Sequence, residues 1–235
     1  MSKFLYTFLL QWKLDVRNRD ILIMYYLVPI GFFLFIGGIF TSIMPDSIET
    51  LIASMTVFGV TMGAVLGFPI PIVELLGSDI KKAYKVGNIS LRIHWLAAFL
   101  ASFVHLFLVS IIIFIFASLI YDATVPENIV FYFIKLTLFI FASLAVGSIL
   151  GVFVKKQTKL TMLSQVIFLP SIMISGIMFS RDLLPGFLQK ISMLFPATWG
   201  FDLLVTEGSV VLEVILLTII MSLIVGVVVW KLKKE

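Results

Sequence analysis

The chain has 235 residues, of which 61% are hydrophobic and 13% are charged. A soluble domain is nearer half apolar and about one quarter charged, so this composition excludes a soluble globular fold and requires lipid as the solvent. The absence of cysteine excludes disulfides, thiolate metal sites and a cysteine nucleophile. The net charge of +4 does not indicate nucleic-acid binding, because the basic residues fall in short clusters between apolar runs.

Residues 3–19 carry too many charges to cross a membrane. Their apolar side chains recur at helical spacing on one face, with Lys13 and Arg17 off that face; they are Phe4, Leu5, Phe8, Leu9, Trp12 and Val16. This pattern predicts an amphipathic helix that lies in the membrane interface. The alternative is a disordered basic tail.

Apolar runs long enough to cross a membrane, which takes roughly 20 residues, follow along the whole chain. Since a span must satisfy its backbone hydrogen bonds internally, we expect them to be α-helices. They cover about residues 21–43, 51–73, 95–121, 129–153, 161–180 and 210–230. No soluble domain can be separated from them, so residues 1–235 are predicted to form one all-α integral membrane domain.

Lysine and arginine in the short flanks predict the orientation of these spans. They cluster in the N-terminal segment, in the loops after the second and fourth spans, and at the C-terminus. With six spans, 14 of the 17 basic residues lie on one side. We therefore predict a multi-pass protein of the cell membrane with cytoplasmic N- and C-termini.

No catalytic motif is found. The chain lacks G-x-x-x-x-G-K-[ST], G-x-S-x-G and H-E-x-x-H, so any ATP must be bound by another subunit. His94 and His105 are eleven positions apart, which does not suit a chelating pair. We predict no catalytic residue and no metal site in this chain.

Small residues mark two of the predicted spans. Gly59, Gly63 and Gly67 lie on one face of the second span, and Gly147 and Gly151 repeat the spacing in the fourth. This pattern lets another helix approach closely, either in a subunit interface or within one bundle. We favour packing within the bundle, because small residues are common in all membrane bundles.

The second span should kink or end near Pro69 and Pro71, which remove backbone donors. In the loop of residues 74–94 that follows, Ser78 is a candidate N-cap with Asp79 in the first turn. A short amphipathic helix over residues 78–86 is predicted from apolar residues at helical spacing and lysines elsewhere; they are Ile80, Ala83, Tyr84, Lys81, Lys82 and Lys85. It either docks a cytosolic partner or lies solvated at the lipid headgroups.

Three polar residues fall inside predicted spans. His105 lies near the middle of the third, Gln165 in the fifth, and Lys135 about two turns into the fourth. Polar and ionisable groups in lipid usually face a protein interior or a wet cavity, so His105 and Gln165 are candidate pathway residues. The alternatives are a hydrogen bond from His105 to a neighbouring helix and a Lys135 side chain that extends to the outer interface.

Residues 175–199 read SGIMFSRDLLPGFLQKISMLFPATW and interrupt the apolar pattern. After Arg181 and Asp182, apolar residues line one side of a segment of ~14 residues, which is too short to cross a membrane. Broken helices at membrane depth need cover by protein or water. We predict a re-entrant or interfacial helical hairpin over residues 181–199 that caps the outer mouth of the bundle.

This sequence resembles the ABC-2 type transporter permeases, the membrane subunits of many bacterial ATP-driven exporters. Ser175-Gly176, the apolar run, Leu184-Pro185, the amphipathic segment and Pro196 are similar to the family's pattern before the last span. A second pattern is weaker: Glu74, Gly77 and Ser78 stand where the family has an acidic residue and Gly-Thr, and Ile89-Ser90 follow. Ser78 replaces the usual Thr, and Asn88 the usual Pro.

The resemblance implies an elbow helix over residues 3–19, six spans, and a coupling loop at 74–94 that receives the motion of an ATPase. The implied coupling residues are Glu74, Gly77, Ser78, Asp79, Ile80, Lys81, Lys82, Ala83, Tyr84 and Lys85. The implied outer gate consists of Ser175, Gly176, Arg181, Asp182, Pro185, Phe187 and Pro196. The implied partners are two cytosolic ABC ATPase subunits, a second permease chain, identical or homologous, and membrane lipid. ATP and Mg would be held by the ATPase, and no cofactor by this chain.

We therefore expect export of a hydrophobic or amphipathic substrate, such as a drug, an antimicrobial peptide or a lipid-like molecule, and a role in resistance. Short outer loops without a receptor domain argue against import. The alternatives are a polysaccharide or lipid-linked glycan exporter, a proton-coupled carrier in which His105 or Lys135 titrates, and a membrane scaffold or sensor that transports nothing.

Overall fold

A computed structural model describes residues 3–78, 81, 84, 86–87 and 90–234. Every regular element in these residues is a helix, which confirms the all-α prediction. The first half contains α1 (Lys3–Arg17), α2 (Arg19–Leu22), η1 (Ile23–Leu27), α3 (Val28–Ile43), η2 (Pro45–Glu49), α4 (Leu51–Met62), η3 (Gly63–Gly67) and α5 (Pro69–Gly77). The second half contains α7 (Leu91–Tyr121), α8 (Ile129–Phe153), α9 (Gln157–Ile174), η4 (Arg181–Leu183), α10 (Gly186–Ser192), α11 (Pro196–Val205) and α12 (Val211–Lys234).

Five helices of the described chain are long and apolar enough to cross a membrane. They are Arg19–Ile43, Leu51–Gly77, Leu91–Tyr121, Ile129–Phe153 and Val211–Lys234, and they match five of the six predicted spans. The exception is the predicted span at 161–180. There α9 covers Gln157–Ile174, begins with polar residues, contains Pro170 and ends six residues early. The count of six spans is therefore not confirmed.

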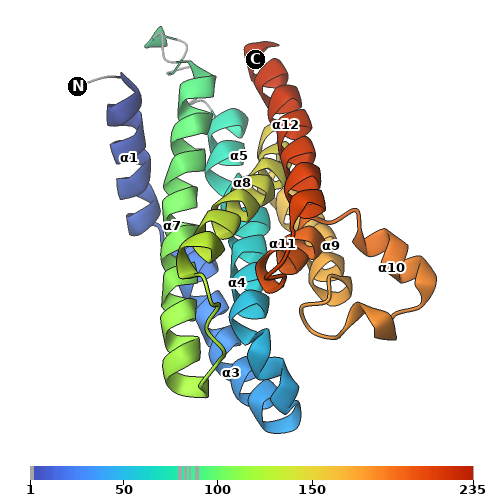
Figure 1. The fold of residues 1–235 in the computed structure, drawn as a ribbon. Coiled ribbons are helices and arrows are strands. Elements are labelled where there is room, and N and C mark those ends of the chain that lie inside the picture. The colour runs from blue at the N-terminus through green and yellow to red at the C-terminus, as the bar shows by residue number, and fades with distance from the viewer. Residues whose placement is uncertain (1–2, 79–80, 82–83, 85, 88–89, 235) are drawn as a thin grey trace.

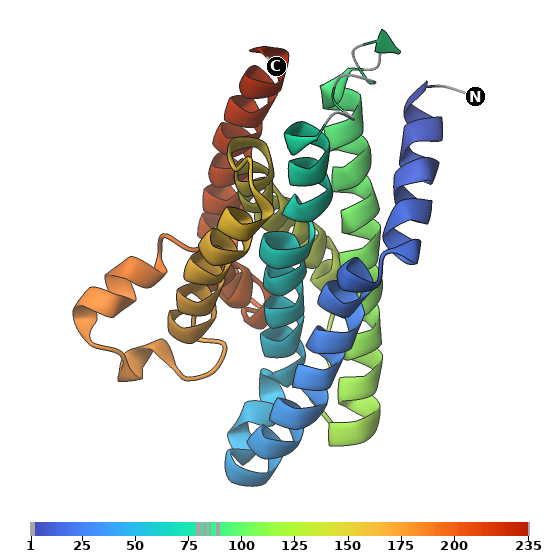
Figure 2. The same ribbon diagram turned by 180° about the vertical axis from the view of Figure 1, so that it is seen from behind.

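Both termini of the described chain lie at the same end of the bundle. Figure 1 shows the start of α1, the end of α5, the start of α7 and the end of α12 at the top, and Figure 2 shows the same from behind. The junction of α3 with α4 and the end of α7 lie at the opposite end. This agrees with the predicted common side of the termini and the loop after the second span.

Helix α4 forms the centre of the bundle. All twelve of its residues are buried, and it contacts α3, α7, α8, α9 and α11. Pro69 does not end this helix. Before it the backbone changes to the π-helical turn η3, where the Phe68 amide donates to the Gly63 carbonyl at 2.9 Å, and the helix then continues as α5. The wider turn accommodates the missing proline donor.

The glycine stripes are packing seams within this one chain. A Cβ on Gly63 would collide with Leu106 of α7 and reach Tyr25 of η1 at 2.8 Å. A Cβ on Gly147 of α8 would collide with the backbone carbonyl of Ala64 in η3. The interpretation as packing within the bundle is thus confirmed for both stripes.

Helix α1 forms as predicted, so the alternative interpretation of residues 3–19 as a disordered tail is wrong. Its polar stripe, Thr7, Gln11 and Asp15, is buried, whereas apolar residues such as Leu5 and Leu14 are exposed. In both views α1 runs alongside α7 and not across the bundle. Within this stripe Asp15 faces His105 of α7, whereas Thr7 and Gln11 form hydrogen bonds inside α1, and the leucines are left toward the surroundings. An orientation flat in the interface is not confirmed.

We predict that Gly147→Ala lowers the stability of the detergent-solubilised protein by about 1–3 kcal/mol, as overpacking of a tight core does. The reason is that the new methyl group has no space against Ala64. Thermal unfolding would measure the loss. Gly226→Ala in α12 is the matched control, because nothing lies within 4 Å of its Cβ position. Equal melting temperatures for the two variants would contradict the packing argument.

Candidate functional site

The end of α5 meets the loop between α8 and α9 in a groove of about 390 Å³. Its lining includes Glu74, Gly77 and Ser78 on one side and Lys155 and Gln157 on the other. A Cβ on Gly77 would lie 2.9 Å from the Lys155 carbonyl oxygen, so only glycine allows this approach. Three predicted coupling residues and a second loop of the same side thus form one surface.

The predicted helix over residues 78–86 is only partly described. Lys81, Tyr84 and Val86 are α-helical, whereas Asp79, Ile80, Lys82, Ala83 and Lys85 lie outside the described residues. Ser78 has extended backbone (φ −117°, ψ 172°), the conformation that an N-cap residue takes. The Tyr84 hydroxyl and His94 Nδ1 are 3.2 Å apart, which ties this segment to α7.

A larger groove of about 710 Å³ lies between α1, α5 and α7. Its lining includes Asp15 and Arg17 of α1, Glu74 of α5, Tyr84 and His94. Glu74 therefore lies at both grooves. A displacement of α5 at Glu74 would therefore change the contacts of α1 as well as those of the loop that follows α5.

A buried polar cluster joins α1 to α7. Asp15 is 2% exposed and His105 1%, and Asp15 Oδ2 lies 3.9 Å from His105 Nε2. Gln11 Nε2 donates to Asp15 Oδ1 at 2.7 Å, and Trp12 stacks on the imidazole with ring centroids 4.2 Å apart. The Tyr26 hydroxyl is 2.8 Å from His105 Nδ1, so His105 does make the expected hydrogen bond to a neighbouring helix.

The carboxyl group of Asp15 is placed where ionisation is costly. Burial raises its pKa from 3.8 to about 7, although the hydrogen bond from Gln11 acts in the opposite direction. His105 Nε2 has no hydrogen-bond partner among the described residues. A proton on Asp15 would therefore face an imidazole nitrogen that lacks a partner.

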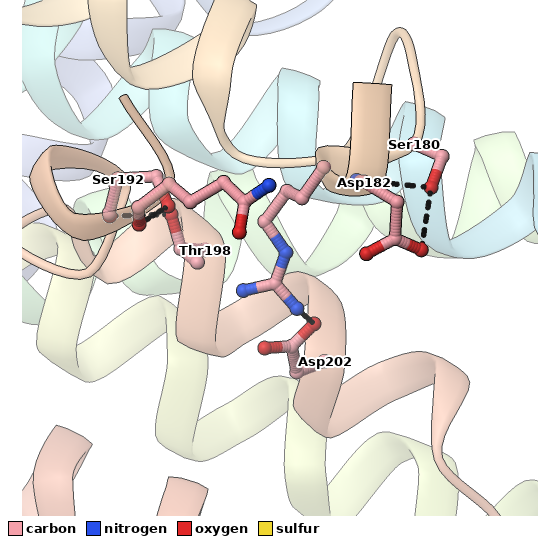
Figure 3. Close-up of polar contacts among 7 residues, drawn as sticks. Ser180, Asp182, Ser192, Thr198 and Asp202 are labelled. Atoms are coloured by element: carbon pink, nitrogen blue, oxygen red, sulfur yellow. Dashed lines mark hydrogen bonds and ion pairs between the residues drawn. The ribbon is translucent and has the colours of Figure 1, made fainter. Parts of the chain in front are cut away.

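The segment after α9 folds back on itself. Ser175 is fully buried, and Gly176 takes a φ of +96°, a left-handed conformation that favours glycine. Arg181 then donates to Asp202 Oδ1 of α11 at 2.6 Å (Figure 3). Burial raises the pKa of Asp202, and the guanidinium of Arg181 opposes that rise.

Contacts between residues close in sequence complete this segment, residues 175–206, which is called the outer segment below after its predicted position. The Thr198 hydroxyl donates to the Ser192 carbonyl at 2.6 Å, and Ser180 Oγ accepts the Asp182 amide at 3.4 Å (Figure 3). Pro185 precedes α10, and Pro196 begins α11. Phe187 on α10 is 63% exposed, and α10 protrudes from the side of the bundle in Figures 1 and 2. The predicted gate residues thus share one folded segment, whose re-entrant position in a membrane is not confirmed.

Lys135 of α8 binds the C-terminal end of α11. Its side chain is only 7% exposed, and Nζ donates to the Thr206 carbonyl at 2.5 Å. Thr206 is the C-cap of α11, where a cation is favoured by the helix dipole. Lys135 therefore does not extend into water but joins α8 to the last turn of α11.

The two candidate pathway residues are not brought together. His105 is enclosed between α1, η1 and α7, whereas Gln165 is exposed on α9. Their role in a pathway stays a prediction.

Sequence reasoning missed two acidic residues of these contacts. Asp15 was detectable, because Thr7, Gln11 and Asp15 recur every four residues and form a polar stripe along one side of the helix. Asp202 had no such signal, because its partner Arg181 is 21 positions away.

These features define a multi-pass α-helical membrane protein with a grooved surface at one end and a folded segment that contacts the far half of the bundle. Among the described residues, no group of three His, Cys, Asp or Glu side chains could hold a metal ion.

The family model of the ABC-2 type transporter matches residues 3–206, so this chain belongs to the ABC-2 type transporter family. It is a transporter membrane component, and the family associates with ABC ATPases. No curated protein and no solved structure matches the chain.

We predict that Asp15→Asn removes a loss of stability that the wild type shows as pH rises from about 4 to about 7. The folded state holds the proton more tightly than the unfolded state, so wild-type stability falls across this window, by at most about 4 kcal/mol. The variant should match the wild type below about pH 4 and exceed it at pH 8. Thermal unfolding across this range is the measurement, with the exposed Asp20→Asn as control. Parallel pH profiles for wild type and Asp15→Asn would refute a buried, titrating Asp15.

We predict that Arg181→Gln and Asp202→Asn each speed amide hydrogen exchange within residues 181–199. Each variant leaves a partly buried polar group without its partner, and a hydrogen bond to a charged group contributes about 1.5–3 kcal/mol. The double variant should therefore add little to either single one. The exposed Lys190→Gln in α10 is the control and should exchange like the wild type. Fully additive effects would mean that the two side chains act independently.

Proposed function

We propose that this chain is the transmembrane permease subunit of an ABC exporter that moves a hydrophobic or amphipathic substrate outward. Two permease chains, identical or homologous, pair around a central pathway. Two separate cytosolic ATPase subunits bind ATP and Mg and dock beneath them. The chain itself is not an enzyme.

The observation that carries this proposal is the continuous, almost wholly buried helix Leu51–Gly77. Its last turn presents Glu74 and Gly77 to the groove beside Lys155, and its first half contacts α11 of the outer segment. A displacement at the groove would therefore reach the outer segment through one packed helix. Coupling of ATPase motion to an outer gate needs such a connection.

The groove at the end of α5 is the proposed ATPase-docking surface, together with the helical residues Lys81 and Tyr84. This surface would face the cytoplasm with both termini, because the positive-inside rule places the basic flanks there. Helix α1 would serve as the elbow, with its exposed apolar side in the inner membrane interface. The proposal places the segment of residues 175–206 in the outer half of the membrane, where Arg181 and Asp202 hold it as a gate.

Helix α9 is proposed to face the second permease chain. An exposed stripe of Met162, Val166, Leu169 and Met173 runs along it, next to the exposed Gln165. This helix is less apolar than the five candidate spans, which suits a protein partner or a wet pathway better than lipid. Gln165 would then lie at the pathway between the two chains.

The buried Asp15–His105 pair favours a second candidate function, a proton-coupled carrier. Transport driven by a pH gradient without ATP would show it. No observation on the chain favours a glycan over another amphipathic substrate.

Purification of the tagged chain from its native membrane would test the main proposal. We expect a Walker-type ATPase to co-purify at about one per permease, with ATPase activity in the eluate and none in the isolated chain. A chain that purifies alone in mild detergent, and transports along a pH gradient, would support the carrier.

We predict that Gly77→Val lowers the ATPase activity of the complex roughly tenfold, which corresponds to ~1.4 kcal/mol on the barrier. The new side chain would push the end of α5 away from the Lys155 carbonyl and so disturb the docking surface. ATP turnover per co-purified ATPase is the measurement. Gly208→Val, where nothing lies within 4 Å of the Cβ position, is the matched control. Normal turnover with Gly77→Val would show that this surface does not couple.

A further inference from the structure

A cavity of about 300 Å³ lies inside the bundle, between α4, η3, α8, α9, α12 and the turn that begins α11. Among the residues that the structure describes, no charged side chain lines it. Its polar side chains are the hydroxyls of Thr61, Ser143 and Ser171, each on a different helix and each at most 5% exposed. The remaining walls are apolar side chains such as Val65, Val146 and Ile220.

The hydroxyl of Thr61 is the unusual group in this cavity. It is buried and has no hydrogen-bond partner in the described chain, whereas Ser171 Oγ donates to the Phe168 carbonyl at 2.8 Å. A buried hydroxyl without a partner is destabilising, since it loses its hydrogen bond to water and gains nothing in return. A ligand that supplies a hydrogen-bonding group next to Thr61 would remove this penalty.

The size and walls of the cavity suit a small apolar ligand. Ligand pockets begin at about 300 Å³ and are mostly apolar with a few placed polar groups. The cavity holds roughly twice the volume of the ~150 Å³ apolar cavity that binds benzene. A charged ligand would be left unpaired among these walls, so an uncharged one is favoured.

The cavity is accessible from the outer turn. Residues 194–197 form part of its wall, and Leu194 among them is 76% exposed. Helix α12, which forms another wall, is mostly exposed along its length. An apolar molecule dissolved in the surrounding bilayer could therefore enter between α12 and this turn.

We propose that this cavity binds a neutral amphiphile from the bilayer, whose apolar chain lies along Val146 and Ile220 and whose single uncharged hydrogen-bonding group pairs with Thr61. The site lies within one chain and needs neither an ATPase nor a second permease. Its existence is thus independent of the proposed exporter function.

The test uses the full chain in lipid nanodiscs and a short-chain alcohol, octanol, that carries a photoreactive diazirine in its chain. We expect saturable labelling of peptides that contain Ile167 and Ile220. Unlabelled octanol should compete at least about tenfold better than octyltrimethylammonium, whose charge finds no partner in the cavity. Equal competition by the charged compound, or labelling that does not saturate, would overturn the proposal on the wild-type protein alone.

Variants then locate the site. Val146→Phe fills the cavity and should reduce saturable labelling about tenfold or more, and Thr61→Val should weaken binding roughly threefold to tenfold through the lost hydrogen bond. Val227→Phe is the matched control, because Val227 is 47% exposed on α12 and does not line the cavity. Unchanged labelling with a folded Val146→Phe protein would place the alcohol elsewhere. If ATPase co-purification failed while this labelling persisted, only the exporter function would be refuted.

Discussion

The close packing of the helix Leu51–Gly77 against its neighbours is the constraint on which the rest of the structure depends. Glycine at 63 and 147 lets α7 and α8 approach this helix to a distance that any side chain would prevent. In lipid, association depends on such packing and not on the hydrophobic effect, because lipid tails are as apolar as the helices. The central helix therefore has little freedom to slide sideways, and displacements along it reach both ends.

The lipid surroundings also explain the polar contacts of α1. In water this helix would bury its apolar face, but here it buries Thr7, Gln11 and Asp15 and exposes leucines. The stripe is stable against α7 because Thr7 and Gln11 form hydrogen bonds within α1 and Asp15 faces His105 of α7. One consequence is that α1 is attached through a titratable contact, so its attachment depends on pH in a way that an apolar contact would not.

Composition and periodicity predicted the helices well because lipid imposes long apolar runs with internal backbone hydrogen bonds. They placed five spans, the helix α1 and an interruption of the apolar pattern before the last span. They did not predict where α9 ends, since Pro170 is tolerated inside it and the break depends on Gly176 in a left-handed conformation. Contacts such as Arg181–Asp202 connect residues 21 positions apart, and no local pattern encodes them.

Helix α8 connects the groove to the segment of residues 175–206, as the central helix does. Near its start, Lys135 holds the last turn of α11, and just beyond its end, Lys155 borders the groove with Gly77. Twenty residues of helix span about 30 Å, the thickness of the hydrocarbon core. Both helices that reach the groove therefore also contact the outer segment, one through packing and one through Lys135. A motion at the groove that moved only one of them would strain Gly147 against Ala64, so we infer that α8 and the central helix move together.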